Sequence, residues 1–135
     1  INLNGLRQDG RSANMLRRVT TIPGSRALRK ADGVVELEQG LTKVIVTVRG
    51  PREPRERSKA LVDRAFITCE FAVSPFATFE RKSQSKHDRR LREAALLVKQ
   101  TMEAAVLSHL YPRSEIAIAI QVLQRDGGKG RGFAI

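Results

Sequence analysis

The chain has 135 residues, and 25 lysines and arginines against 14 acidic residues give it a formal net charge of +11 at pH 7. This length is that of one domain able to bury a core, and the charge favours nucleic acid as a partner because basic side chains release counterions from phosphates. Aromatic residues make up only 4% and tryptophan is absent, so the anchors of a membrane-surface helix are missing.

Other features narrow the class of protein. No apolar run approaches the roughly 20 residues that span a bilayer, and residues 1–11 lack the apolar core of a signal peptide, so we expect an intracellular protein that binds no membrane. Cys69 is the only cysteine and lies in an apolar run, which excludes a disulfide within the chain and predicts a buried, inert thiol. His87 and His109 are isolated and do not have the spacing of metal ligands.

The first half of the chain reads as turns and strands. Turn residues at 8–10 and 23–25 flank a short mixed segment, Met15 to Ile22. Two β-rich runs, 34–38 and 42–49, are separated by Gln39-Gly40 and predict a hairpin, whose second strand ends at Gly50-Pro51. Its alternating valines, Val44, Val46 and Val48, predict one deeply buried face.

A charged loop and a third strand follow. Residues 52–59 contain two prolines, and strand character returns over 61–73 with Ala65, Ile67, Cys69, Phe71 and Val73 in phase. Ser74-Pro75 ends or bends this strand.

The next segment predicts a helix about six turns long. Ser85 and Asp88 have the spacing of a capping box, so the helix should begin near Lys86, and Tyr111-Pro112 should end it. Its core-facing residues recur at steps of three and four: Leu91, Ala95, Val98, Met102, Val106 and Leu110.

A last strand is predicted over 116–123. Its isoleucines share one face, while the small Ala117 and Ala119 leave room for a close neighbour on the other. Asp126-Gly127-Gly128 then opens a basic tail. The order of elements predicts an α/β or α+β fold in one domain, a mixed sheet covered on one face by a long helix.

The first candidate site is the basic loop and helix start. A helix N-terminus offers unpaired N–H groups and a partial positive charge, so added arginines make a phosphate site, and Arg90, beside the apolar stripe, is the best candidate for phosphate. A solvated charged face is the alternative. The basic residues of the stretch are Arg81, Lys82, Lys86, Arg89, Arg90 and Arg92.

Two further stretches could bind anions. Residues 52–59 either bind a polyanion or form a surface loop whose charge aids solubility. The glycines of 126–131 could cradle a phosphate, although they lack the spacing of a Walker or dinucleotide motif. No Ser/His/Asp set or carboxylate pair stands out, so the residues predict no catalytic group within the chain.

The sequence resembles the RNase PH family of exosome ring subunits. The matching pieces occur in family order from about Gly5 to Gly128, which leaves 129–135 as a non-matching tail. They are Gly5 to Arg11, Ala31-Asp32-Gly33, Glu38 to Lys43, Gly50-Pro51-Arg52-Glu53, Phe79 to Lys82, Asp88-Arg89-Arg90, Tyr111 to Ser114, and Val122 to Gly128.

The resemblance implies a β-α-β RNase PH fold, a ring of related subunits, and 3′-to-5′ RNA decay or processing. It implies that Arg52, Arg55, Arg57 and Lys59 line the RNA entry, and that Arg81, Lys82, Arg89 and Arg90 contact RNA or phosphate, with Arg90 expected at phosphate. From the charge pattern and the glycine run we also expect RNA contact at Lys86 and phosphate contacts at Gly127, Gly128 and Arg131.

The sequence departs from the family in two ways. The resemblance implies a Gly-Ser-Arg or Gly-Thr-Arg phosphate clamp, whereas this chain has Gly128-Lys129-Gly130-Arg131 without the hydroxyl residue. It also implies a second α/β half carrying catalytic acids, and we expect the chain to lack most of that half.

These observations favour a non-catalytic exosome ring subunit that guides RNA. Two alternatives stay open: an active phosphorolytic 3′-to-5′ exoribonuclease, which would use inorganic phosphate as co-substrate, and a free-standing RNA-binding protein. No metal or cofactor is expected otherwise. The resemblance implies single-stranded RNA, other RNase PH-like ring subunits and RNA-binding cap subunits as partners, in the nucleus, nucleolus and cytoplasm.

Overall fold

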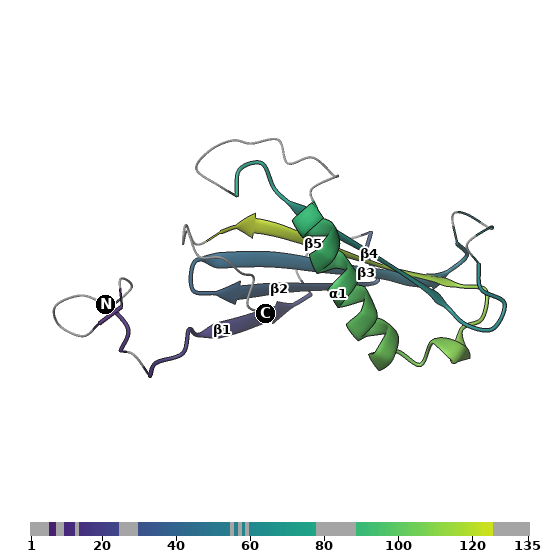
Figure 1. Cartoon of the computed structure of the whole chain (residues 1–135), viewed down its shortest axis with the longest axis horizontal. Coiled ribbons are helices and arrows are strands. Elements are labelled where there is room, and N and C mark those ends of the chain that lie inside the picture. The colour runs from purple at the N-terminus through teal and green to yellow at the C-terminus, as the bar shows by residue number, and fades with distance from the viewer. Residues whose placement is uncertain are drawn as a thin grey trace.

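The computed structural model describes residues 6–7, 10–12, 14–24, 30–54, 56, 58, 60–77 and 89–125. Within these ranges the strand order in the sheet is β1-β2-β3-β5-β4, and all neighbours are antiparallel except the parallel pair β4 and β5 (Figure 1). This arrangement confirms the predicted mixed sheet. The elements are β1 (Val19–Pro23), β2 (Gly33–Gln39), β3 (Thr42–Arg52), β4 (Phe66–Val73), α1 (Arg89–Ala105), a 3₁₀-helix (Ser108–Leu110) and β5 (Glu115–Gln124).

The predicted hairpin is present as β2 and β3. Gly40 has a φ of 62° in the turn between them, a conformation that glycine adopts without strain. β1 then extends the sheet by pairing with β2, and the Gly24 N–H donates to the Val34 carbonyl at 3.0 Å where β1 ends. The sequence predicts a turn at Pro23, but Pro23 is the last residue of β1 and pairs with Val35 of β2. Because β1 is an edge strand, the missing N–H of a proline costs little there.

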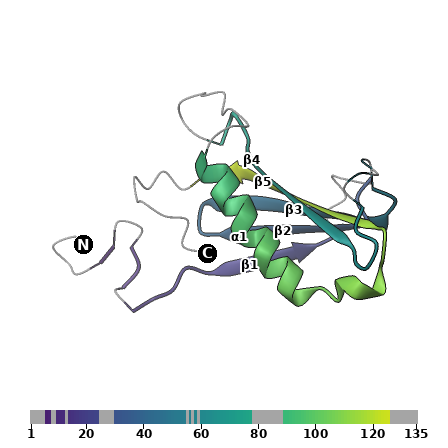
Figure 2. The same ribbon diagram turned by 45° about the vertical axis from the view of Figure 1, so that its right-hand side comes forward.

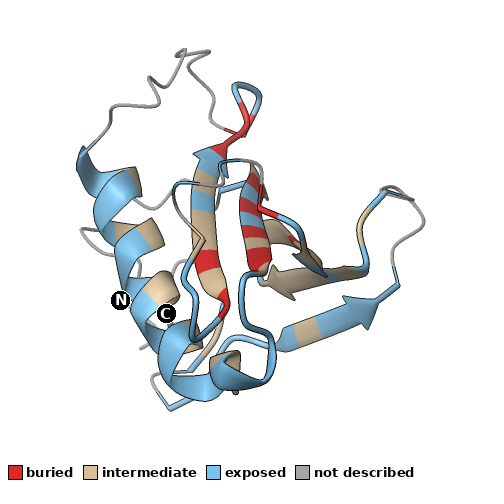
Figure 3. Cartoon of the chain, turned by 90° about the vertical axis from the view of Figure 1, so that its right-hand side faces the viewer, coloured by how far each residue is buried: buried red, intermediate tan, exposed pale blue. Residues whose placement is uncertain are grey.

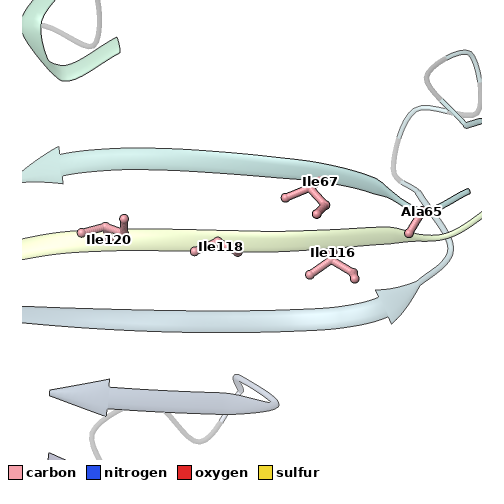
Figure 4. Packing of buried hydrophobic residues seen from close by; sticks show 5 residues of the cluster. All are labelled: Ala65, Ile67, Ile116, Ile118 and Ile120. Carbon is pink, nitrogen blue, oxygen red and sulfur yellow. The ribbon is translucent and has the colours of Figure 1, made fainter. Parts of the chain in front are cut away.

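Helix α1 lies across one face of the sheet (Figure 2). Val98 and Met102 of α1, and Val106 directly after it, pack against the buried cluster at β4 and β5, which confirms this part of the predicted stripe. The half-buried side of α1 faces the sheet, and its outer side is exposed (Figure 3). The buried cluster that receives the helix consists of Ala65, Ile67, Ile116, Ile118 and Ile120 (Figure 4).

The burial of β3 differs from the prediction. Val44, Val46 and Val48 point toward the helix side but are only half-buried, because the helix packs over β4 and β5. Thr47, on the opposite face, is buried at 8% exposure, and its hydroxyl donates to the Ala119 carbonyl at 3.4 Å. The face predicted to be less buried therefore contains the most buried side chain of the strand.

The helix ends earlier than predicted. α1 stops at Ala105, and the Val106 N–H donates to the Met102 carbonyl at 2.9 Å, after which Leu107 leaves helical geometry with a ψ of 66°. The Ser108 carbonyl then accepts the Ala65 N–H at 2.8 Å, so the chain pairs with the start of β4. Leu110 is 57% exposed and does not belong to the core stripe.

Two strand boundaries also differ. β4 begins at Phe66 and not at Leu61, because residues before it bond to the connection that precedes β5, as in the Arg113 N–H to Leu61 carbonyl bond of 3.0 Å. β3 does not end at Gly50-Pro51 but continues to Arg52, opposite Glu115 of β5. The predicted capping residues Ser85 and Asp88 lie outside the described residues.

Cys69 is half-buried on β4, which corrects the expectation of full burial. Burial, followed by the negative charge of Glu70, raises the pKa of its thiol above the ordinary value of 9.0. A thiol that stays protonated is a poor nucleophile, so this environment agrees with the predicted inertness.

The first prediction concerns the core between α1 and the sheet. Ile67 is 1% exposed, so Ile67→Ala should lower the free energy of unfolding by roughly 2–5 kcal/mol through lost burial and a residual cavity. The measurement is urea unfolding followed by circular dichroism. Leu16→Ala, at a residue 89% exposed, is the control and should change stability by about 0.5 kcal/mol or less. Equal effects of the two substitutions would contradict this account of the core.

Candidate nucleic-acid interface

Three of the residues predicted to bind RNA or phosphate lie in the described part of the chain. Arg52 is the last residue of β3, whereas Arg89 and Arg90 are the first two residues of α1. Their roles stay predictions. The other predicted site residues, Arg55, Arg57, Lys59, Arg81, Lys82, Lys86, Gly127, Gly128 and Arg131, lie outside the described residues.

The start of α1 is an exposed, positively charged surface. Arg89 and Arg90 are both exposed, and the first turn has no acidic residue. Arg89 Nε donates to Glu93 Oε1 at 2.8 Å, but the arginine side chain is 86% exposed, so this ion pair contributes little to stability. Arginines beside the positive end of a helix dipole are unfavourable for the free protein, and a bound anion would relieve this repulsion.

The position of this helix start follows from the parallel pair. Because β4 and β5 are parallel, both end at the same edge of the sheet, and α1 begins there after β4. Leu91 packs against the Val73 and Val122 cluster, and the Arg125 N–H donates to the Ala77 carbonyl at 3.2 Å. Arg125, the residue after β5, therefore lies at the edge at which α1 starts, a usual place for ligands in such sheets.

Arg52 lies at the other end of the same strands. Its β5 partner Glu115 also pairs with Phe66, the first residue of β4, whereas Leu91 packs near the last. The length of β4 thus separates the two regions by about 25 Å along the sheet. The structure places Arg52 away from Arg89 and Arg90, as two distinct parts of a surface.

Arg52 instead lines a pocket of about 330 Å³ on the sheet face opposite α1. Ala117 and Ala119 of β5 form its floor, which confirms that these small residues leave room on this face. β3 contributes one wall and β4 the other. The remaining lining residues are Thr47, Arg49, Arg52, Pro54, Glu56, Phe66, Thr68, Glu70, Glu115 and Ile118.

A bulge at Gly50 puts two arginines on the same wall. Arg49 pairs with Ala117 and Arg52 with Glu115, so three steps along β3 match two along β5. Side chains three apart in a regular strand point to opposite faces, and the extra residue returns Arg52 to the face of Arg49. The Gly50 N–H donates to Asp32 Oδ2 at 2.7 Å, which holds the bulge from the adjacent β2 side.

Both arginines have an unused donor. The Nε atoms of Arg49 and Arg52 are buried, and no described residue accepts a hydrogen bond from either. A buried donor without an acceptor costs roughly 1–3 kcal/mol, so the free energy of folding bears this cost at both positions. Two guanidinium groups that line one pocket suit an oxyanion.

The pocket also has acceptors. Thr68 Oγ1 on β4 donates at 3.1 Å to Glu115 Oε1 on β5, and Glu70 lies exposed on β4, two residues after Thr68. Glu56, which follows β3, lines the pocket as well. The two arginines therefore lie on β3, and the exposed carboxylate of Glu70 lies on β4, on the other side of the alanines. The sequence analysis does not single out Arg49, Glu70 or Glu115. The signal that could have identified this pocket is the glycine in Arg49-Gly50-Pro51-Arg52, together with the small residues of the Ala-Ile-Ala run in the last strand.

The described residues contain no helix long and apolar enough to cross a membrane. Over the same residues, no group of three or more histidine, cysteine, aspartate or glutamate side chains could hold a metal ion.

Comparison with known sequences identifies one family. Residues 15–131 match the profile of the RNase PH family, described as "3' exoribonuclease family, domain 1". The chain is 47% identical over 125 residues to the exosome complex component RRP41 of Mus musculus, covering 92% of this chain and 50% of that one. It is 39% identical to the exosome complex component Rrp41 of Methanopyrus kandleri, covering 95% of this chain and 52% of the relative.

Solved structures give the same picture. A crystal structure of Rrp46 from rice (Oryza sativa) superposes with a TM-score of 0.68 at 27% identity, covering 90% of this chain and 53% of that one. The Archaeoglobus fulgidus exosome with RNA bound to the active site gives a TM-score of 0.66 at 25% identity, covering 93% and 50%. The chain spans about half the length of the relatives it matches.

The second prediction concerns Gly50. An added Cβ would lie 2.5 Å from the Glu115 carbonyl oxygen, and the φ of 122° strains any L side chain, so Gly50→Ala should cost roughly 2–4 kcal/mol of unfolding free energy. Gly24→Ala is the control, because its φ is 74° but nothing lies within 4 Å of the added atom. Gly24→Ala should cost only about 1–2 kcal/mol by thermal unfolding. If both variants lose the same unfolding free energy, the close approach of β3 to β5 adds nothing to the cost of the substitution at Gly50.

Proposed function

Because the chain belongs to the RNase PH family, we propose that it acts as a ring subunit of an RNA exosome, binding and guiding single-stranded RNA for 3′-to-5′ processing and degradation. The observation that carries the proposal is the exposed Arg89-Arg90 pair, which lies at the carboxyl edge of the parallel strands and at the positive end of α1. Ordinary surfaces mix charges in the first helical turn, whereas this turn has no acid.

Assembly is part of the proposal. The relatives it resembles are named as exosome components, so we propose other RNase PH-like ring subunits and RNA-binding cap subunits as neighbours. A site of action in the nucleus, nucleolus and cytoplasm belongs to the same proposal.

We further propose that this chain does not itself cleave RNA. The support is the sequence Gly128-Lys129-Gly130-Arg131, which lacks the hydroxyl residue of the phosphate clamp that the resemblance implies. Arg90 then holds an RNA phosphate and no inorganic phosphate co-substrate is consumed.

The third prediction tests the RNA contact at α1. Fluorescence anisotropy of a labelled single-stranded RNA, measured across salt concentrations, should show binding that weakens steeply with salt because counterions are released. Arg90→Ala should weaken binding and reduce the magnitude of the slope by about 0.7, the value for one phosphate contact on a single strand. Arg18→Ala is the control, at an exposed arginine before the edge strand β1, and should leave the slope unchanged. If the salt dependence of RNA binding has the same slope in both variants, Arg90 does not contact an RNA phosphate.

The fourth prediction tests catalysis and assembly. The chain incubated with RNA and inorganic phosphate should release no nucleoside diphosphates, and release that Arg90→Ala abolishes would establish an active phosphorolytic exoribonuclease instead. Co-expressed RNase PH-like subunits should co-elute with the chain in gel filtration. Persistent separate elution would favour a free-standing RNA-binding protein.

A further inference from the structure

The pocket opposite α1 is not accounted for by the phosphate contact at the helix start. It lies on the other face of the sheet, and Arg52 at its rim is separated from the start of α1 by the length of β4. Its size is within the range of small-molecule sites, and its lining is polar on both sides of an alanine floor. These features suit a ligand with an acceptor on one side and a donor on the other.

The donor wall is complementary to a phosphate group. Arg49 and Arg52 both lie on β3, both Nε atoms are buried, and no described residue accepts from them. Each guanidinium group has four further N–H donors besides Nε–H, and those that reach the pocket can donate to phosphate oxygens.

The acceptor wall excludes a bare anion as the best ligand. Glu70 is exposed on β4 and lines the pocket there. Glu115 is buried on β5 as the register partner of Arg52, and one of its oxygens accepts a hydrogen bond from Thr68. These carboxylates would repel inorganic phosphate, but they would attract a neutral hydroxyl donor. A carboxylate is the group that commonly accepts a hydrogen bond from a ribose hydroxyl.

The spacing between the walls agrees with such a ligand. β5 lies between β3 and β4, so the two walls are about 9–10 Å apart at the backbone. Thr47, Ala119 and Glu70 align across the three strands, and Arg49, Ala117 and Thr68 form the next row. Glu70 is thus diagonal to Arg49 across the alanine floor, at a distance that the side chains and a sugar phosphate would fill.

We propose that this pocket binds one ribonucleotide unit, with its phosphate at Arg49 and Arg52 and its ribose 2′-hydroxyl donating to Glu70. This inference rests on the proposed RNA binding and adds a means of distinguishing RNA from DNA, since only RNA carries the 2′-hydroxyl. The ligand is either a nucleotide within a bound RNA or a free ribonucleotide, and both present the same two groups.

The test compares hexanucleotides of uridine and of deoxyuridine by fluorescence anisotropy with the full chain. The wild-type chain should bind RNA about tenfold more tightly than DNA, as expected for one hydrogen bond to a charged group. Glu70→Ala should abolish this preference, and Glu70→Gln should keep most of it because the amide oxygen still accepts a hydrogen bond. Glu103→Ala, at an exposed residue of α1 on the other face, is the matched control and should retain the preference.

The readout separates recognition from general electrostatics. If Glu70 acts only through its charge, Glu70→Ala raises the affinity for RNA and DNA equally, the ratio stays at its wild-type value, and the inference is overturned. Arg49→Gln should weaken binding of both oligonucleotides, and Arg49→Lys should restore part of it. Thermal unfolding of each variant shows that the fold is intact.

Two further outcomes keep this inference distinct from the proposed function. A wild-type chain that binds RNA and DNA equally overturns the ribonucleotide pocket but leaves RNA binding in place, whereas a chain that binds neither overturns the proposed function. Free uridine monophosphate should compete in an Arg49-dependent manner, while inorganic phosphate at the same concentration should not. If inorganic phosphate competes at that concentration without a ribose attached, the proposed role of the ribose is overturned.

Discussion

The close approach of β3 to β5 at Gly50 is the constraint on which the open face of the sheet depends. The backbone there passes so near the Glu115 carbonyl oxygen that a Cβ would lie 2.5 Å from it. Only glycine can occupy the position, and the resulting bulge changes which face Arg52 points toward. Asp32, just before β2, accepts the Gly50 N–H, so two segments far apart in the sequence fix one local distortion. Without this distortion, Arg49 and Arg52 would lie on opposite faces of β3.

The parallel pairing of β4 and β5 divides the chain's charged residues into two regions. At the carboxyl edge, α1 begins with two exposed arginines, and Arg125 after β5 bonds to Ala77 at the same edge. At the amino edge, the bulge of β3 meets Glu115 and forms the pocket. A buried core of β-branched residues joins the two ends, since Ile67, Ile118 and Val122 are each nearly inaccessible. The same two strands therefore support both regions rigidly, which a pair of surface loops would not do.

The spacing of apolar residues predicts those strands and helices that bury a single face. The alternation of isoleucines in β5 and the three-to-four spacing of Val98, Met102 and Val106 each identify one buried face, and the structure confirms both. Boundaries were missed where long-range backbone bonds decide them. The Ser108 carbonyl is used by Ala65, a pairing that no local pattern encodes, and it ends the helix before Leu110. Likewise Pro51 predicts a strand end from local geometry, but the antiparallel partner β5 carries the strand past it to Arg52.

The two candidate sites also differ in how much of each can be predicted from the sequence, because one is local in the chain and the other is not. A dense run of positive charge is visible in the sequence itself, so it predicts an anion contact at Arg89 and Arg90, and the net charge of +11 predicts a polyanionic partner in general terms. Such charge gives affinity that is largely independent of which nucleic acid is bound. The pocket combines residues from three strands, in which positive and negative groups face each other across Ala117 and Ala119. Balanced groups of this kind add little to net attraction, but they respond to the pattern of donors and acceptors on the ligand. If the basic surface supplies attraction and the pocket supplies selectivity, the two functions can change independently, because the length of β4 lies between them.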